Sequence, residues 1–436
     1  MSRWSIDRVI VLPRAVRPDA WFPGLQGLVA ALLVLFPVFL LPKMSVSNGV
    51  FTLLACWGLG CLLVPGRDRE RWGTYWRSVA GLSLAFLLWP AAVAIHQAAA
   101  GLPVSVPYLF TRFILLFVLA WGLVRLGGRR LAWMAWGCAA AAIYAAVWIH
   151  FATLDMRPDH VGIYNIIPFS NLALLMGALA ALSIGWDEPR HYMVHGMKLV
   201  ALLAGMYVAY AGQTRGSWLA VPVLAYAVCA SYRHGPRRLR VAALVALAVV
   251  GVSIAGTSDM VRERVAEGVV ALAGSRDTLD SSSGGRIQVW RASLRIFAEH
   301  PWTGVGLEHF KAELGEQAEA GLITGDAAEL PHSHNDILYA MATYGVPGLI
   351  AVLALYLAPA VFFARKLRSA APHVACAAAM GLTTAASFFI FGLTETMFSV
   401  SITNAFYVLI MAWLAASVVC REQDWGAAGG AGEMRP

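Results

Sequence analysis

Long apolar segments alternate with short polar ones along almost the whole chain. Stretches of about 20 apolar residues recur from Leu25 to Val419, the length that the hydrocarbon core of a bilayer requires of a helix. The pattern therefore predicts an all-α polytopic membrane protein with about 12 transmembrane helices. The expected spans are 25–42, 47–65, 78–98, 107–125, 131–151, 161–185, 197–212, 216–232, 239–257, 335–363, 372–393 and 400–420.

One connection is far longer than the others. Residues 258–334 separate the ninth and tenth spans by 77 residues, well beyond a usual helix–helix connection. We expect spans 1–9 within 1–257, spans 10–12 within 335–420 and a short tail at 421–436. The large loop should be partly helical. Ile287, Trp290, Leu294 and Phe297 recur at helical spacing from about 287 to 299 and predict an amphipathic stripe.

Composition excludes a single soluble domain. Hydrophobic residues make up 59% of the 436 residues and charged residues only 13%, against about 25% charged in soluble domains. The first 24 residues contain four arginines and three prolines, unlike a cleavable signal peptide, so we expect the first span to be an uncleaved anchor. No cysteine lies in the large loop, and we expect reduced core residues without disulfides. The cysteines are Cys56, Cys61, Cys138, Cys229, Cys376 and Cys420.

The net charge of +8 has its explanation in membrane orientation. Twelve spans place 22 of the 33 basic residues on the side that holds both termini, and basic residues are enriched in cytoplasmic loops. We therefore expect cytoplasmic termini and an outward-facing large loop. Binding of nucleic acid, the alternative for a basic protein, is not expected.

Three arginines lie on the outer side against this bias. Arg112, Arg157 and Arg215 each fall at a predicted outer boundary, where charged groups usually face a wet cavity or the interior of the bundle. Snorkelling to lipid headgroups is the alternative for any one of them. Because Arg286 lies in the adjoining loop, we favour an anion site formed by the group.

Two of these arginines stand where a helix is expected to begin. Arg215 lies within Gly212–Ser217, among small residues between the seventh and eighth spans, and Arg286 follows Ser281–Gly285. A guanidinium beside the free N–H groups of a helix N-terminus suits a phosphate.

The large loop ends in Pro331-His332-Ser333-His334-Asn335-Asp336. A His-x-His pair can bind a metal, but no third ligand with familiar spacing stands nearby, so we expect none. A structural histidine is the second reading. A general base is the third, because nearby arginines would keep an imidazole neutral.

Arginines beside a histidine base suit the transfer of a group from a lipid-linked diphosphate. Such a leaving group needs cations to stabilise its developing charge, which arginines supply, while the attacking alcohol needs a base. No cofactor is required.

Three motifs resemble those of the O-antigen ligase family (WaaL). His334-Asn335, followed after nine residues by Gly345-Val346-Pro347-Gly348, resembles the family's histidine motif. Gly285-Arg286 with Pro301–Gly306 resembles the loop segment, of the Wzy_C type, that ligases share with O-antigen polymerases. Thr214–Ser217 resembles its upstream arginine motif.

The resemblance implies a GT-C-type glycosyltransferase of the bacterial inner membrane. Its members transfer O-antigen polysaccharide from undecaprenyl diphosphate to a sugar hydroxyl of lipid A–core at the periplasmic face, by an inverting, metal-independent displacement. By resemblance, His334 is the base, and Arg215 and Arg286 bind the donor diphosphate. Arg112 and Arg157 are added from charge placement alone.

Three rival functions remain open. An O-antigen polymerase would use a second lipid-linked glycan as acceptor. A protein O-oligosaccharyltransferase usually carries more sequence than the 16 residues that follow Cys420 here. A lipid or solute transporter would predict internal repeats, and none is evident.

Overall fold

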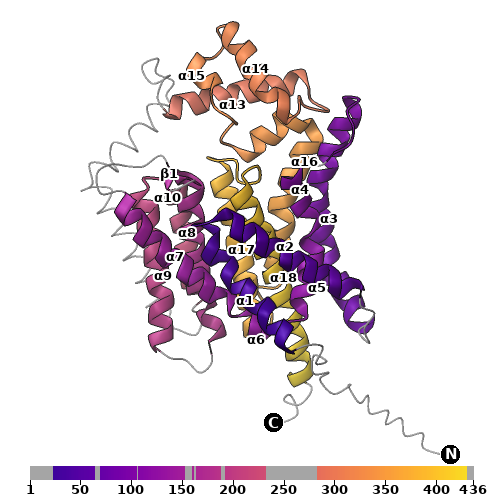
Figure 1. The fold of residues 1–436 in the computed structure, drawn as a ribbon, viewed down its shortest axis with the longest axis vertical. Helices are drawn as coiled ribbons and strands as arrows, with labels where there is room; N and C mark the ends of the chain where they lie inside the picture. The colour runs from indigo at the N-terminus through magenta and orange to yellow at the C-terminus, as the bar shows by residue number, and fades with distance from the viewer. Residues whose placement is uncertain are drawn as a thin grey trace, which may run out of the picture.

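The computed structural model describes residues 23–63, 69–105, 107–152, 160–161, 164–187, 192–231 and 282–429. The chain forms a helical bundle topped at one end by a small group of helices (Figure 1). In sequence order, the bundle comprises α1 (Pro23–Leu40), α2 (Met44–Leu63), α3 (Arg69–Ala99), α4 (Tyr108–Ile114), α5 (Leu116–Val124), α6 (Gly128–Leu131), α7 (Met134–Ala152), α8 (Ile166–Leu182), η1 (Ser183–Trp186), α9 (Tyr192–Ala211), α10 (Arg215–Ser231), α16 (Asp336–Ala364), α17 (Pro372–Gly392) and α18 (Ser401–Gly429). One two-residue pairing, β1 (His160–Val161) with β2 (Tyr164–Asn165), precedes α8.

The predicted class of fold is confirmed. Among the described residues, eight helices are long and apolar enough to cross a membrane, and the apolar parts of α1 and α10 are shorter. The chain is thus an all-helical, multi-pass membrane protein. The span expected at 239–257 lies outside the described residues, and the one expected at 107–125 is divided at Leu115 into α4 and α5.

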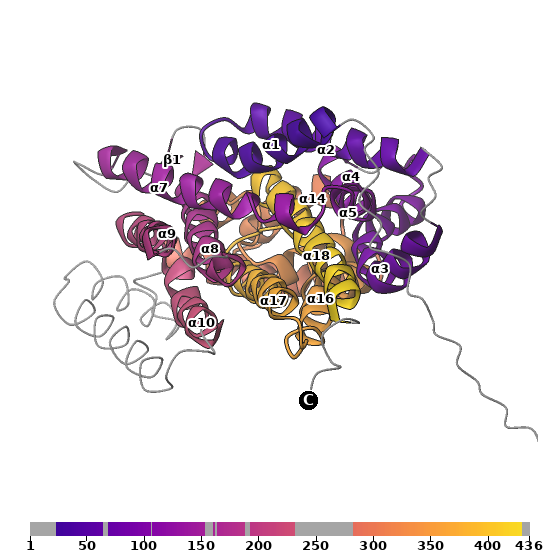
Figure 2. The ribbon, with the colours of Figure 1, turned by 90° about the horizontal axis from the view of Figure 1, so that it is seen from below.

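The centre of the bundle is α18. Its apolar stretch is buried throughout, as expected of a helix that is hydrophobic on all faces. Seen from below, α1 and α2 lie on one side of α18, and α16 and α17 lie on the other (Figure 2). The helix continues to Gly429, past the end expected at 420.

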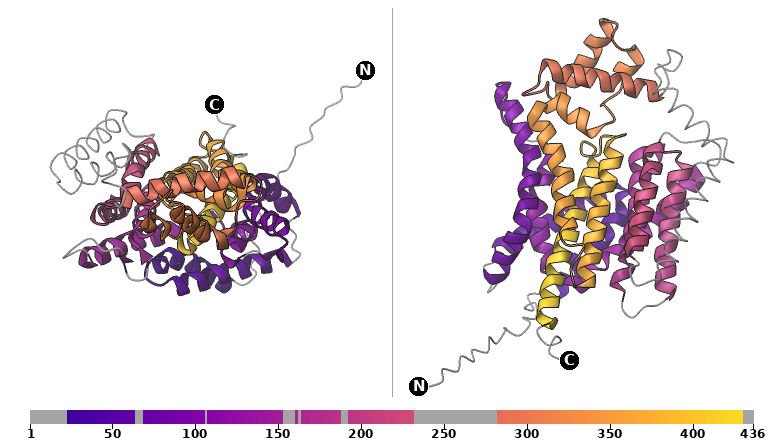
Figure 3. Two further views of the ribbon diagram at one scale, coloured as in Figure 1. Left: turned by 90° about the horizontal axis from the view of Figure 1, so that it is seen from above. Right: turned by 180° about the vertical axis from the view of Figure 1, so that it is seen from behind.

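The large loop contributes a cap, defined as α13 (Ser282–Glu299), α14 (Leu307–Glu319) and α15 (Gly325–Ala328) with their connections up to residue 334. The cap has its own small core of Val289, Ile296, Phe310 and Leu314, which Tyr339 of α16 extends. It lies above α16, at the end of the bundle opposite to the C-terminal end of α18 (Figure 3).

The apolar stripe predicted for α13 is wrong in its register. Val289, Ala292 and Ile296 are the buried apolar residues, whereas Leu294 is 48% exposed. The two sets lie on neighbouring faces of the helix, and helical spacing alone does not say which face meets the rest of the cap.

A kink in α16 joins the cap to the bundle. Pro347 has no N–H to donate to Thr343 O, and Gly345 departs from helical geometry with φ +63°. Segment 301–306 replaces the lost helix bonds: Val305 N donates to Ala342 O (3.0 Å), Gly306 N to Thr343 O (2.9 Å), and Val346 N to Pro301 O (2.7 Å). The Pro301–Gly306 and Gly345–Gly348 motifs are therefore hydrogen-bonded to each other and together form the connection between the cap and the bundle.

Candidate functional site

The histidine loop, Pro331–Asn335, lies where the cap meets α16. Asn335 caps this helix, because its side-chain oxygen accepts hydrogen bonds from Ile337 N and Leu338 N, both at 3.0 Å. Trp290 of α13 donates to Ser333 O at 2.8 Å. His334 stands between these anchors with φ +50°, a left-handed conformation that is uncommon for a residue other than glycine. Backbone strain of this kind persists where the surroundings impose it, often at functional sites.

A second loop, residues 393–400 between α17 and α18, lies beside the histidine loop. Asn335 Nδ2 donates to Leu393 O at 3.2 Å, so one side chain both caps α16 and holds this neighbouring loop. Phe398 N donates to the buried carboxylate of Asp336 at 3.1 Å, and Asn404 Nδ2 donates to Phe398 O at 3.0 Å. The position of loop 393–400 is thus fixed from both sides.

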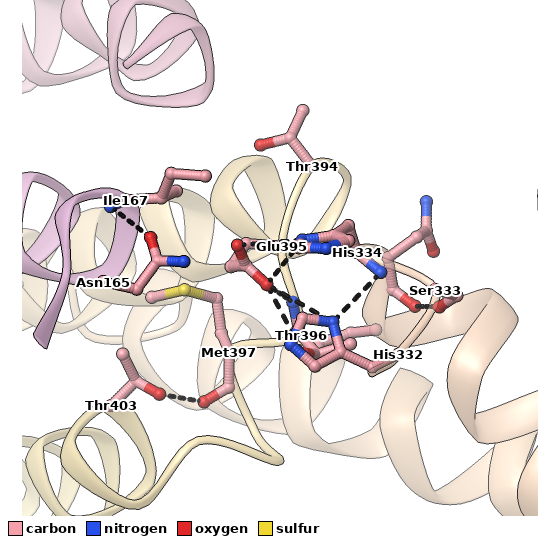
Figure 4. A network of polar contacts seen from close by, with 12 residues as sticks. Asn165, Ile167, His332, Ser333, His334, Thr394, Glu395, Thr396, Met397 and Thr403 are labelled. Carbon is pink, nitrogen blue, oxygen red and sulfur yellow. Dashed lines mark hydrogen bonds and ion pairs between the residues drawn. The ribbon is translucent and has the colours of Figure 1, made fainter. Parts of the chain in front are cut away.

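Loop 393–400 presents Glu395 to the two histidines (Figure 4). His334 Nδ1 lies 3.1 Å from the carboxylate, and His332 Nδ1 lies 3.6 Å from Oε1. Glu395 is 2% exposed, and its Oε1 also accepts a hydrogen bond from Thr396 N at 2.9 Å. The buried carboxylate is thus hydrogen-bonded to His334, and His332 lies beside it with its Nδ1 accepting a hydrogen bond from His334 N at 3.4 Å.

The electrostatics of this cluster keep the carboxylate ionised. Burial alone would raise the pKa of the Glu395 carboxyl. The hydrogen bond from His334, the electrostatic interaction with both histidines and, last, the charge of Arg286 outweigh burial and lower the pKa to about 2. A carboxylate only accepts hydrogen bonds, so the His334 nitrogen that faces it, Nδ1, carries the proton. The lone pair of a neutral His334 ring is therefore on Nε2.

His332 is a neutral group near pH 7. Burial lowers the pKa of this imidazole most. The Glu395 carboxylate opposes the shift, while His334 and Arg286 add to it, so that the pKa is about 4. The expectation that nearby arginines keep a histidine neutral thus applies to His332, although burial is the larger cause.

Arg286 stands at the cap side of this cluster. It lies in α13 one helical turn before Trp290, which contacts the histidine loop, so both side chains project from the same face. Its charge acts on both His332 and Glu395. The structure thus brings Arg286 close to the histidine loop.

The expected position of Arg286 at a helix N-terminus is wrong. The helix α13 already begins at Ser282, because Gly284 and Gly285 are part of it, so Arg286 lies within the second turn.

Arg215 begins α10, next to loop 393–400. The structure does not describe its side chain, but the backbone position is clear. A Cβ at Gly216 would collide with Thr394 Oγ1, so the Gly216 backbone lies directly against the Thr394 side chain, one residue before Glu395. Thr214 Oγ1 donates to Ser217 Oγ at 2.7 Å, and Ser217 to Asn171 Oδ1 at 2.6 Å, which ties this motif to α8.

Arg112 has different surroundings from those expected of a phosphate ligand. Its side chain is buried and donates to Ser401 O (2.6 Å), Ser401 Oγ (3.1 Å) and Asn48 Oδ1 (3.1 Å). These bonds join α4 to the start of α18 and to α2. Arg157 lies outside the described residues.

A cavity of about 250 Å³ opens beside the Glu395 cluster. His332 and Glu395 form its polar end, and Ser401, which Arg112 holds from behind, forms part of the wall. The remaining lining residues are Met44, Asn165, Pro168, Val400 and Ile402. The cavity thus combines a polar end with an apolar wall, as small-molecule sites commonly do.

Glu395 is the residue that sequence reasoning missed. Arginines on the outer side stand out because they conflict with the positive-inside bias, whereas an acid there does not. The rule that charged groups at the membrane boundary usually face the bundle interior would have found it, since Glu395 lies between the last two spans in an otherwise uncharged stretch from Arg368 to Arg421. Only the fold shows that Glu395 lies beside His334, which is 61 residues earlier in the chain.

Comparison with known proteins agrees with the motifs. Residues 199–353 match the family model described as O-Antigen ligase, a range that includes Arg215, Arg286 and the histidine loop. The chain is thus a multi-pass membrane protein in which residues 199–353 are similar to the O-antigen ligase family, and the resemblance stated from the motifs is confirmed.

A curated relative from Haemophilus influenzae, described as an uncharacterized protein, is 19% identical over 250 residues, which are 56% of this chain. The matched part spans 63% of that relative's length.

Proposed function

We propose that this protein transfers a polysaccharide from undecaprenyl diphosphate to a sugar hydroxyl of lipid A–core. The support comes from the family match, which includes the arginine and histidine motifs, and from the cavity that His332 and Glu395 line. The cap lies on the side predicted to face outward, so the reaction would occur at the periplasmic face of the inner membrane, with both termini in the cytoplasm.

The observation that carries the proposal is the pair His334–Glu395. Because the ionised carboxylate accepts from Nδ1–H at 3.1 Å, Nε2 is left with its lone pair and can take a proton from an attacking hydroxyl. The carboxylate then stabilises the imidazolium that forms, as the aspartate does in Ser-His-Asp triads. In this proposal His334 is the base and Glu395 orients it.

Arg286 and Arg215 bind the diphosphate in this scheme. They come from two different helices, one from the first turns of α13 in the cap and the other from the first residue of α10. A developing diphosphate charge between two guanidinium groups is stabilised without reorganisation, and one such donor contributes about 10²–10³ in rate. Arg112 supports the cavity wall through Ser401, and a direct role for Arg157 stays a prediction.

The reaction is a single displacement. The acceptor oxygen forms a bond to the anomeric carbon of the donor while the bond from that carbon to the diphosphate oxygen breaks. The hydroxyl proton passes to His334 Nε2, and the bonding electrons leave with the diphosphate. Attack from the face opposite to the leaving group inverts the anomeric configuration, and the arginines supply the cations that a metal would otherwise provide.

Reconstitution with competing acceptors tests the proposed substrate. Purified protein in liposomes would receive undecaprenyl diphosphate-linked glycan together with lipid A–core, a second lipid-linked glycan, or a Ser/Thr-containing protein. We expect product on lipid A–core. Product on the second glycan alone would instead identify a polymerase, and product on protein an O-oligosaccharyltransferase.

A further inference from the structure

His332, His334 and Glu395 are close enough together to hold a metal ion. One ligand atom from each lies within 4.8 Å of the other two, and Nδ1 is the nitrogen of both histidines that faces the Glu395 carboxylate. The sequence offered only a His-x-His pair without a third ligand. The fold supplies the third from loop 393–400.

We propose that these three residues bind a divalent transition metal ion such as Zn²⁺, and that the bound ion prevents His334 from acting as a base. The binding of the ion is independent of the proposed function. The inhibition of transfer by the ion rests on that proposed function.

The spacing of the ligand atoms fits a small ion. With zinc–ligand bonds of about 2.0–2.1 Å in a tetrahedron, the ligand atoms are about 3.3 Å apart. The His334–Glu395 and His332–Glu395 separations of 3.1 Å and 3.6 Å lie on either side of this value. The third separation, between the two histidine nitrogens, is within 4.8 Å, so small side-chain adjustments would bring the three ligand atoms to this spacing.

The surroundings meet two further requirements of a metal site. Thr396 N donates to Glu395 Oε1 at 2.9 Å, and outer hydrogen bonds of this kind orient a ligating carboxylate. His332 and Glu395 also line the 250 Å³ cavity, so an ion can enter from it and find a fourth ligand there, either water or a phosphate oxygen.

The kinds of ligand select the kind of ion. Two imidazole nitrogens and one carboxylate oxygen are the ligand set of several catalytic zinc sites. Imidazole favours Zn²⁺, Cu²⁺ or Ni²⁺, whereas Mg²⁺ and Ca²⁺ prefer oxygen ligands. We therefore expect Zn²⁺ to bind and Mg²⁺ to have no comparable affinity.

The inhibition depends on which nitrogen of His334 binds the ion. Glu395 accepts a hydrogen bond from Nδ1–H and leaves Nε2 free to take a proton. A metal ion on Nδ1 displaces that proton, and the neutral ring then carries its hydrogen on Nε2. The same two residues that prepare the base would in this way hold the ion that removes it.

Direct binding tests the site without any assay of transfer. The purified full-length protein would be titrated with Zn²⁺ by calorimetry, and with Co²⁺ to record the visible absorption of a four-coordinate site. His332→Ala removes one ligand and leaves the His334–Glu395 pair, and His309→Ala, an exposed histidine of α14, is the matched control. We expect one Zn²⁺ per chain in the wild type and in His309→Ala. In His332→Ala we expect at least about 100-fold weaker binding, the upper end of what loss of an outer-shell partner costs.

Transfer activity is then measured with and without Zn²⁺. We expect Zn²⁺ to inhibit the wild type, a chelator to restore it, and the fraction of activity lost to be much smaller in His332→Ala. Equal affinity for Zn²⁺ in His332→Ala and wild type would overturn the site, and so would Mg²⁺ binding as tightly. Full transfer by the zinc-loaded wild type would overturn the inhibition. If lipid A–core is not the acceptor, the binding results still decide the site.

Discussion

His334 and Glu395 lie 3.1 Å apart although 61 residues separate them in the chain. Asn335 brings their loops together, because it caps α16 and also donates to Leu393 O. The pair is buried on the side of the bundle that the cap covers, and Arg286 lies close enough for its charge to affect it. The geometry gives Glu395 a clear task in the proposed reaction, which is to fix the tautomer of the base.

Glu395→Gln should lower the rate of transfer with little effect on donor binding. Glutamine fills the same space but no longer holds Nδ1–H with a charged acceptor or stabilises the imidazolium. We expect kcat to fall by about 10²–10⁴, in line with loss of the aspartate from a Ser-His-Asp triad, and KM for the donor to change little. Glu319→Gln, an exposed acid of α14, should retain full kcat. An unchanged kcat in Glu395→Gln would remove this carboxylate from the mechanism.

Arg286→Ala should weaken binding of the diphosphate donor. The charge that stabilises the leaving group is lost, and we expect kcat/KM to drop by about 10²–10³. Arg286→Lys should recover little if the guanidinium binds two phosphate oxygens at once. Arg291→Ala, which removes an exposed charge from the same helix, is the control, and an equal loss there would point to general electrostatics instead.

Arg112→Ala should act on stability. Its bonds to Ser401 and Asn48 connect three helices inside the bundle, and leaving their buried acceptors unsatisfied costs about 1–3 kcal/mol each. We expect a lower melting temperature in detergent. Donor affinity should stay within about threefold of wild type, because the hydrogen bonds of Arg112 are made to protein groups. A large loss of donor affinity with unchanged melting would instead make Arg112 a phosphate ligand.

Gly304→Ala should loosen the cap. Gly304 has φ +62°, and a Cβ there would collide with the backbone of Thr343 at the α16 kink. The left-handed backbone costs about 1–2 kcal/mol and the clash about 1–3 kcal/mol, so melting should shift clearly downward. Gly315→Ala, in the interior of α14 with open space around it, should be neutral or stabilising by about 0.5–1 kcal/mol. Equal melting temperatures of Gly304→Ala and Gly315→Ala would contradict the proposed connection between segment 301–306 and the kink of α16.

The sequence predicted most of the fold, because the bilayer imposes a simple rule on helix length. The spans appear as apolar runs, and the histidine and arginine motifs are local in sequence. The break at Leu115 leaves no comparable signal, since residues 107–125 are apolar on both sides of it. The buried face of α13 depends on packing against α14 and α16, which periodicity does not specify.

The composition of the site was harder to predict than its location. His334 and Arg286 were found because each lies in a recognisable segment. Glu395 was not, because its partner is distant in sequence and a lone acid between two spans has no local pattern. Arg112 was grouped with the other outer arginines by position alone, and only its contacts with Ser401 and Asn48 separate it from them.

The most direct test of the proposed mechanism is transfer by His334→Ala in liposomes that contain the lipid-linked donor and lipid A–core. Donor binding and melting temperature are measured on the same preparation. The mechanism predicts normal folding, retained donor binding and no polysaccharide attached to lipid A–core. Polysaccharide attached at the wild-type rate by His334→Ala would contradict it.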